Sequence, residues 1–277
     1  LLHLQVTTEL LRRAGQDLYR DPELGPVIKS NYDVLLRAMT PDLTVFGKND
    51  DGPFESLPGW ASVFEIGYAR FRDPHYGWII SHGERRSPLA LQYGEPELNA
   101  KAPPVTSNVL EDVGWAVMRA PQDERYWQGT GLCVLMDFGP HGGWHGHPDA
   151  LSMDLYALGT VLLRDQGMCP VGYGAREHWD WYRHTLGHNT VTVDGLQQMF
   201  VYGDDNAPTE AGTGGRTTFI SLGPDINAVE ARDDAAYPGA VYQRAVVTIG
   251  ANYLVDFFQV TMPGEHIFDY ALHGLGR

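Results

Sequence analysis

The feature that most constrains this chain is a succession of short strand-like segments in its second half. Seven of them lie between Trp115 and Met262, and glycine, proline, asparagine or aspartate residues separate one from the next. They read WAVMRA, GLCVLMDFG, LSMDLYALGTVLLRD, NTVTVDG, TTFISLG, AVYQRAVVTI and NYLVDFFQVTM. Because no helical pattern lies between these segments, an antiparallel sheet is favoured over a parallel one. The segments predict an antiparallel β-sandwich.

The first hundred residues have helical periodicity instead. Leu4, Leu11 and Leu18 are spaced one heptad apart, and the segments GPVIKSNYDVLLRAMTPD and GWASVFEIGYARF repeat apolar residues at helical spacing. A polar loop, GKNDDGPF, lies between those two segments. The helices carry more apolar surface than two or three elements could bury alone, which suits a larger helical array.

A change of composition separates the two halves. The stretch GEPELNAKAPPVTS, residues 94–107, is rich in proline and polar residues and is typical of a linker. We therefore predict an α+β multidomain chain. Its helical domain covers residues 1–98, its linker residues 99–106, and its antiparallel β-sandwich residues 107–277.

Charge and cysteine content exclude several classes of protein. The net charge is −15, and residues 96–277 hold 10 basic but 22 acidic side chains. A nucleic-acid binder needs a basic footprint, so this composition argues against one. No apolar run approaches the length of a membrane span. Two cysteines, Cys133 and Cys169, are too few for a disulfide framework and form either one bridge or two buried thiols.

One carboxylate interrupts an apolar strand pattern. In TVLLRDQG, alternation places Asp165 on the same face as Val161 and Leu163. A carboxylate on an apolar face is costly to bury without a partner. Either the strand end has already reached solvent at this point, or a cation compensates the charge.

Histidines supply the other candidate ligands. His145 and His147 form a His-x-His pair in GWHGHPD, and His188 lies in HTLGHNTVTVDG. Each alone is typical of a solvated or hydrogen-bonded turn residue. Together with Asp165, two imidazoles and one carboxylate form a common ligand set for Zn²⁺ with a fourth position open. The glycines around the pair leave open whether both histidines face one metal or point apart.

The same motifs resemble a known family. HGHPDALSMDLYALGTVLLRDQG followed by YRHTLGHNTVTVDGLQQ resembles the signature of the heparinase II/III-like polysaccharide lyases, of alginate- and heparin-lyase type. The resemblance is dense over residues 141–198, and LLRRAGQDLYRDP loosely resembles a late helix of the family's α/α toroid. It implies a partial α/α toroid followed by a β-sandwich, in a fragment that lacks part of the toroid and the C-terminal end. It also implies a periplasmic or secreted protein.

The resemblance implies roles for individual residues. His147, Asp165 and His188 would bind Zn²⁺ or another divalent cation that organises the site, and His145 would be the catalytic histidine. The family is a group of carbon–oxygen lyases that cleave uronic-acid-containing acidic polysaccharides by β-elimination. A toroid tyrosine, with an asparagine or histidine, does much of that work. These residues would lie upstream of Leu1, so the fragment itself is expected to be inactive.

Several residues around the motifs are candidates for binding an acidic polysaccharide or oligosaccharide. They are Trp144, Tyr173, Arg176, Tyr182 and Arg183. An arginine can bind both oxygens of a uronate carboxylate, and an aromatic ring can stack on a sugar. The alternative for each is a surface or packing residue. Asp149, which follows the histidine pair, could instead orient an imidazole.

Two other functions fit parts of the pattern. A cupin-like metal enzyme also places a His-x-His pair and a later histidine on a β-sandwich. Cupins expect a glutamate shortly after the pair, whereas Asp149 comes too soon and Asp165 comes late. A non-catalytic carbohydrate-binding module with a buried metal is the second alternative.

Overall fold

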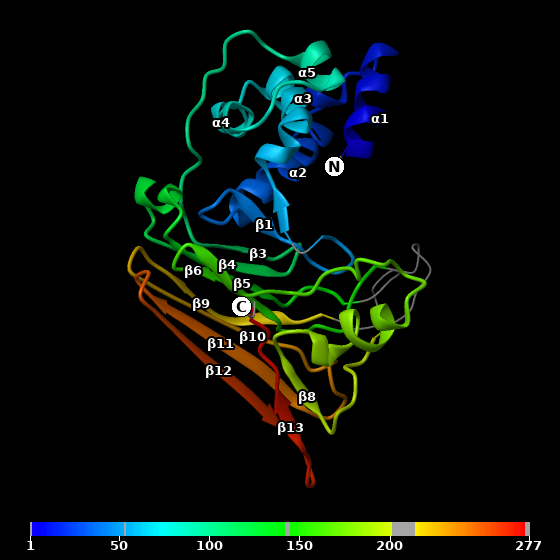
Figure 1. Ribbon diagram of the computed structural model, residues 1–277, viewed down its shortest axis with the longest axis vertical. Coiled ribbons are helices and arrows are strands. Elements are labelled where there is room, and N and C mark those ends of the chain that lie inside the picture. Colours follow the sequence, from blue (N-terminus) through cyan, green and yellow to red (C-terminus); the bar gives the residue numbers. More distant parts are fainter. Residues whose placement is uncertain (1, 53, 142–144, 201–213, 275–277) are drawn as a thin grey trace. The chain divides into compact units, whose positions relative to one another are not determined.

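The computed structural model describes residues 2–52, 54–141, 145–200 and 214–274 (Figure 1). The chain forms two compact units. The helical unit comprises Leu1–Met39, Leu43–Val45 and Glu55–Pro104, and the sheet unit comprises Thr40–Asp42, Phe46–Phe54 and Val105–Arg277. The segment Phe46–Phe54 therefore belongs to the sheet unit, although helices precede and follow it in the sequence.

Five helices form most of the helical unit. They are α1 (Leu2–Arg13), α2 (Leu24–Ala38), α3 (Ala61–Phe71), α4 (Pro74–His82) and α5 (Pro88–Tyr93). Helices α1, α2 and α3 occupy the three segments predicted to be helical. The rings of Tyr32, Phe64 and Tyr76 pack together with centroids 5.1 to 5.6 Å apart, so aromatic residues form the centre of this unit.

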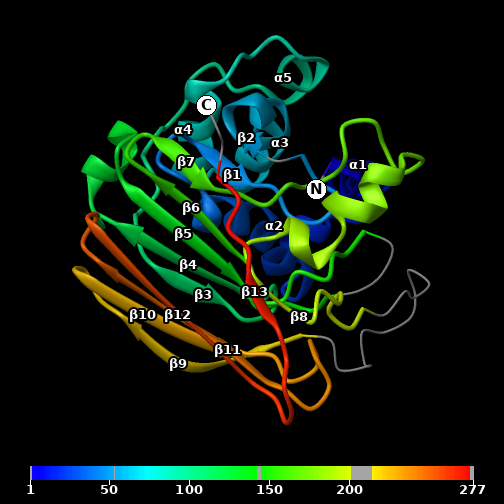
Figure 2. The same cartoon turned by 60° about the horizontal axis from the view of Figure 1, so that its bottom comes forward.

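The sheet unit contains a five-stranded sheet and a four-stranded sheet (Figure 1, Figure 2). The first has the order β3 (Asn108–Leu110), β4 (Trp115–Ala120), β5 (Leu132–Asp137), β6 (Met153–Ala157), β7 (Thr160–Leu163). The second has the order β12 (Tyr253–Thr261), β11 (Val241–Ile249), β10 (Ile226–Arg232), β9 (Arg216–Leu222). Within both sheets neighbouring strands pair antiparallel, as predicted.

Two short sheets complete the strand inventory of the described residues. Strand β8 (Val191–Val193) pairs antiparallel with β13 (Phe268–Tyr270), which runs beside it in Figure 2. Strands β1 (Thr44–Phe46) and β2 (Phe54–Ser56) form the other pair. They lie where the chain passes from the helical unit into the sheet unit and back.

The two larger sheets share one hydrophobic core. Alternate residues of β5, such as Val134 and Met136, pack in the same cluster as Val229 of β10 and Val246 of β11. Strand β5 is buried along its whole length, because Cys133, Leu135 and Asp137 are covered on its opposite face. That opposite face is where the polar side chains of the candidate site gather.

The structure decides between the two alternatives for the cysteines. Cys133 and Cys169 are both free and buried, so the alternative of two buried thiols is correct. None of the helices in the described part of the chain combines the length and the hydrophobicity that crossing a bilayer requires.

A buried tyrosine hydroxyl ties strand β8 to the core. Tyr242, on β11, is fully buried, and its hydroxyl donates to the carbonyl of Val191 at 2.6 Å. It also accepts from the Gln198 amide at 3.0 Å and from the backbone N–H of Val191 at 3.2 Å. The hydroxyl of Thr190 lies 2.8 Å away. This one oxygen therefore satisfies polar groups from several segments.

Replacing that hydroxyl tests the importance of the network. Tyr242→Phe leaves buried partners of the hydroxyl unsatisfied, so it is expected to lower the free energy of unfolding by about 1–3 kcal/mol. Urea denaturation followed by circular dichroism measures the change. The matched control is Tyr253→Phe, at a tyrosine that is 66% exposed. Equal midpoints for the two variants would show that the network does not stabilise the unit.

Candidate functional site

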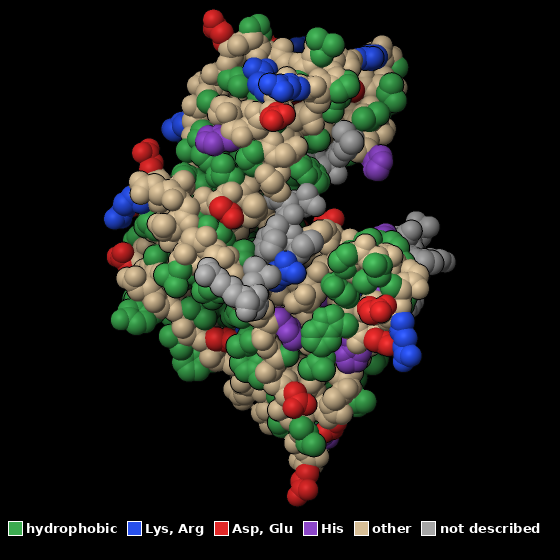
Figure 3. All heavy atoms as spheres, in the orientation of Figure 1, with side chains coloured by type: hydrophobic (Ala, Val, Ile, Leu, Met, Phe, Trp, Pro, Cys, Tyr) green, Lys and Arg blue, Asp and Glu red, His purple; other side chains and the backbone are tan. Residues whose placement is uncertain are grey.

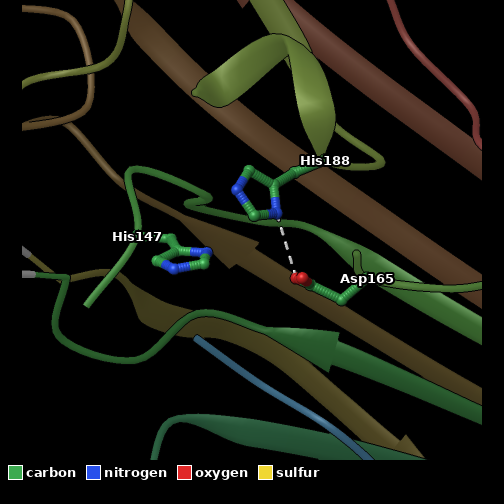
Figure 4. Close-up of side chains that lie close together, drawn as sticks. All are labelled: His147, Asp165 and His188. Atoms are coloured by element: carbon green, nitrogen blue, oxygen red, sulfur yellow. Dashed lines mark hydrogen bonds and ion pairs between the residues drawn. The ribbon is translucent and has the colours of Figure 1, made fainter. Parts of the chain in front are cut away.

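Three buried side chains that are far apart in the sequence meet in the sheet unit. One possible ligand atom from each of His147, Asp165 and His188 lies within 4.8 Å of the others. Nδ1 of His188 lies 3.0 Å from Oδ2 of Asp165. Figure 4 shows the three side chains pointing toward one another. Two imidazoles and a carboxylate in this arrangement are able to hold a divalent cation.

The local structure explains how Asp165 reaches this position. It follows β7 by two residues, where its backbone N–H donates to the Asp154 carboxylate. Its own Oδ1 accepts from the N–H of Gly167 at 2.9 Å, at a glycine with φ of 61°. The side chain of Asp165 is only 2% exposed. The alternative that this strand end has reached solvent is therefore wrong.

His147 and His188 come from irregular segments on either side of the β6–β7 pair. His147 lies between β5 and β6, and its backbone N–H donates to Oδ1 of Asn49 at 3.0 Å. His188 ends the 3₁₀ turn Thr185–Gly187 that precedes β8. Nδ1 of His147 and Nε2 of His188 are buried and have no hydrogen-bond partner within the described residues. Such atoms are uncommon in folded proteins, and a bound cation is one explanation for them.

A buried lysine compensates the carboxylates beside these residues. Nζ of Lys48 lies 2.7 Å from Oδ2 of Asp154, 3.6 Å from Oδ2 of Asp165 and 3.9 Å from Oδ2 of Asp137. Burial would lower the pKa of Lys48, but Asp154 and Asp165 raise it above its ordinary value. Burial would likewise raise the pKa of Asp165, but His188 and Lys48 hold it well below its ordinary value. Both groups are therefore charged at neutral pH.

A second carboxylate connects the two histidines of the His-x-His pair. Asp50 lies 3.0 Å from Nε2 of His147 through Oδ1 and 3.0 Å from Nδ1 of His145 through Oδ2. Burial would raise the pKa of Asp50, but the hydrogen bonds with His147 and His145 lower it. The His147 side chain is fully buried, whereas that of His145 is 68% exposed. The two histidines thus have different environments, which the sequence left open.

An aromatic residue, Tyr173, contacts His145, and exposed tryptophans lie nearby in the sequence. The hydroxyl of Tyr173 lies 3.0 Å from Nδ1 of His145, and the indole N–H of Trp179 donates to the carbonyl of Tyr173 at 3.0 Å. Tyr173, Trp179 and Trp181 are exposed, and Trp179 and Trp181 lie on a π-helical turn, His178–Tyr182. Figure 3 shows apolar and histidine side chains at the surface of the sheet unit. π-helical turns are often found at functional sites.

The remaining sequence candidates lie in different environments. Arg183 is 3% exposed, with its guanidinium 5.1 Å from the ring of Trp179 and 4.8 Å from that of Phe200. Arg176 is exposed and pairs with Asp180 at 2.6 Å. Tyr182 is partly buried. Trp144 lies outside the described residues.

Asp149 orients an imidazole that the sequence did not single out. Its Oδ1 lies 2.8 Å from Nδ1 of His141, and both side chains are buried. Sequence reasoning also missed Lys48, Asn49 and Asp50, because they lie in a stretch that is typical of a solvated loop. Their partners are also distant in the sequence: Asp50 and His147 are 97 residues apart, so local pattern does not reveal the contact.

Lys48 allows a direct test of the buried charge network. Lys48→Met leaves the carboxylates of Asp154 and Asp165 without their cation, so it is expected to destabilise the metal-free chain by about 3–5 kcal/mol. The exposed Lys101 provides the control, since Lys101→Met is expected to change the free energy of unfolding by less than about 0.5 kcal/mol. Urea denaturation in the presence of a chelator compares them. Indistinguishable midpoints would refute a stabilising role for Lys48.

Comparison with known proteins supports the resemblance seen in the motifs. Residues 102–259 match the family described as heparinase II/III-like, C-terminal. A heparin-sulfate lyase of Pedobacter heparinus is 24% identical over 159 residues, which are 56% of this chain and 21% of that protein.

Solved structures show the same fold. A heparinase III gene product superimposes on this chain with a TM-score of 0.70 at 18% identity. The alignment covers 93% of this chain and 36% of the heparinase III chain. The heparan sulfate lyase HepC of Pedobacter heparinus superimposes with a TM-score of 0.67 at 18% identity. That alignment covers 88% of this chain and 34% of the HepC chain. The chain thus spans about a third of these structures. Since the family match extends over more than half of its residues, the chain belongs to the heparinase II/III-like family.

Proposed function

We propose that this chain is part of a polysaccharide lyase that cleaves a uronic-acid-containing acidic polysaccharide by β-elimination. The observation that carries the proposal is the convergence of His147, Asp165 and His188 beside an exposed His145. Family membership supports it, as do relatives named heparin-sulfate lyase and heparinase III. The family match also favours a lyase over a cupin-like enzyme. Because the substrate is an extracellular polymer, we place the protein in the periplasm or outside the cell.

The proposal extends to the architecture. The helical unit would be part of an α/α toroid, and the sheet unit would be the β-sandwich of the family. The boundaries predicted from the sequence place the helical domain at residues 1–98 and the sandwich at 107–277. Two antiparallel sheets around one core support the sandwich.

The candidate metal centre fits a divalent cation, with Zn²⁺ as the best match to its ligands. His147, Asp165 and His188 would hold the ion, and the buried nitrogens without hydrogen-bond partners support this assignment. The bound cation would join three segments that are distant in the sequence and so stabilise the fold. It would organise the site rather than attack the substrate.

His145 is the proposed catalytic residue of this chain. In β-elimination a base removes the proton next to the uronate carboxylate, a carbon–carbon double bond forms, and the bond to the leaving oxygen breaks. The leaving oxygen then takes a proton. An exposed imidazole that is held by Asp50 and Tyr173 is suited to such a proton transfer.

The candidate substrate-binding residues differ in exposure, and we propose different roles for the exposed and the buried ones. Tyr173 and Arg176 are exposed and are proposed to contact the sugar and its carboxylate. Tyr182 and Trp144 stay in the proposal as ring-stacking candidates. Arg183 is buried beneath Trp179, so we propose that it acts by holding that ring.

The metal assignment predicts distinct effects for the two histidines of the pair. His147→Ala and His188→Ala are expected to lose nearly all bound metal, because each removes one of three ligands. His145→Ala is expected to retain metal and stability. Elemental analysis of the purified variants measures this, with the exposed His82→Ala as a control. Equal metal content in His188→Ala and the unmodified chain would remove His188 from the ligand set.

The activity is tested with a protein that spans the full length of its lyase relatives. Incubation with uronate polymers is expected to release an unsaturated product, detected by its ultraviolet absorbance. His145→Ala is expected to lower turnover by about 100-fold or more, in the range of a lost general acid or base. Absence of product from every uronate polymer tried would contradict the lyase assignment. Binding without product would favour a non-catalytic carbohydrate-binding module.

A further inference from the structure

We infer that Asp50 is a positioning residue that sets the proton positions of both histidines in the His-x-His pair. One carboxylate would thereby connect the metal ligand His147 to the catalytic His145. The inference rests on the function proposed above for these two histidines. Asp50 itself touches neither the substrate nor the metal in this account.

The geometry assigns one oxygen of Asp50 to each imidazole. Oδ1 lies 3.0 Å from Nε2 of His147, and Oδ2 lies 3.0 Å from Nδ1 of His145. The Asp50 side chain is 2% exposed, so water does not compete freely for these oxygens. His178 is also close, with its Nε2 3.6 Å from Oδ1. A buried carboxylate shared between imidazoles is a strong constraint on their orientation.

The chemistry of a carboxylate then determines the tautomers. An ionised carboxylate only accepts hydrogen bonds, so Nε2 of His147 carries the hydrogen and Nδ1 keeps its lone pair. Nδ1 of His147 is the buried nitrogen that has no hydrogen-bond partner among the described residues. It is therefore free to bind the metal. Metal-binding histidines commonly donate their other N–H to a carboxylate in this way.

The same argument applies to the exposed histidine. Nδ1 of His145 donates to Asp50, and the hydroxyl of Tyr173, 3.0 Å from that nitrogen, can share the hydrogen. Nε2 of His145 is then unprotonated in the neutral ring. This leaves the exposed imidazole ready to accept a proton from a substrate.

Neighbouring residues hold Asp50 in place. Its backbone N–H donates to the carbonyl of His145 at 3.3 Å, and Asn49 accepts from the backbone N–H of His147. Lys48, two residues before Asp50, forms an ion pair with Asp154. Asn49 has a left-handed backbone, with φ of 58°, which asparagine tolerates better than most residues. Three consecutive residues thus each attach to a different part of the site.

The experiment compares Asp50→Asn and Asp50→Glu with Asp51→Asn, which changes the exposed neighbouring carboxylate. Long-range ¹H–¹⁵N NMR of the histidine rings in this chain reports the tautomers. Competition with a chromophoric chelator reports the affinity for Zn²⁺. In the unmodified chain we expect hydrogen on Nε2 of His147 and on Nδ1 of His145.

Asp50→Asn is expected to change the tautomer populations of both histidines and to weaken Zn²⁺ binding by about 10–100-fold. Asp50→Glu keeps a carboxylate, so its tautomer populations are expected to lie between those of Asp50→Asn and those of the unmodified chain. Asp51→Asn is expected to leave the tautomers unchanged. A folded Asp50→Asn variant with unaltered tautomers and Zn²⁺ affinity would overturn the inference. If Asp50→Asn does not fold, the tautomers of the unmodified chain decide: hydrogen on Nε2 of His147 and on Nδ1 of His145 would support the inference, and hydrogen on Nδ1 of His147 or only on Nε2 of His145 would overturn it.

These readouts separate this inference from the proposed function. If the full-length protein cleaves no uronate polymer, the lyase assignment fails, but the tautomers still show whether Asp50 controls both rings. If the unmodified chain binds no Zn²⁺, the metal assignment fails, and the NMR comparison again decides the role of Asp50.

Discussion

The candidate site depends on the ion pairs between the buried ammonium of Lys48 and three carboxylates. Asp137 and Asp154 lie on the face of the five-stranded sheet that is turned away from the shared core, and Asp165 follows the last strand of that sheet. Burying such carboxylates without compensation would cost several kcal/mol each. Lys48 lies within 3.9 Å of all three, so a single cation supports their burial. Burial still raises the pKa of Asp137 above its ordinary value and that of Asp154 to about 6, so Lys48 compensates the three carboxylates only in part.

The segment that carries Lys48 also carries Asp50, so one short stretch of chain contacts both the buried carboxylates and the histidine pair. Phe46–Phe54 belongs to the sheet unit, while the residues on both sides of it belong to the helical unit. Within this segment Lys48 contacts the carboxylates, and Asp50 contacts both histidines of the pair. The chain connection therefore links the environment of His145 to that of the buried centre. The Asp50 carboxylate contacts His145 and His147 directly, so the two rings share one hydrogen-bond acceptor.

Much of this arrangement follows from sequence pattern, and the rest does not for identifiable reasons. Alternation predicts the antiparallel strands, and the family motifs bring together His147, Asp165 and His188. Strand β10 was not predicted, because its inward residues Asn227, Val229 and Ala231 include polar and small side chains that weaken the alternation. The domain limits and the roles of the site residues stay predictions.

The burial of charged residues was the harder part to predict. Asp165 alone allowed a solvated strand end, whereas its side chain is buried against His188 and Lys48. Lys48 and Asp50 lie in a sequence that is typical of a solvated loop. Their burial depends on partners about a hundred residues away, which local pattern does not reveal. The positions of these charged residues therefore depend on tertiary contacts with oppositely charged partners, which local sequence does not show.

X-ray absorption spectroscopy of the Zn²⁺-loaded chain is the most direct test of the central claim. Two imidazoles and one carboxylate predict a coordination shell of nitrogen and oxygen at about 2.0–2.2 Å, with the outer-shell scattering of histidine rings. Sulfur scattering at about 2.3 Å would instead indicate thiolate ligation by Cys133 or Cys169. That result, or a shell without histidine, would contradict the account.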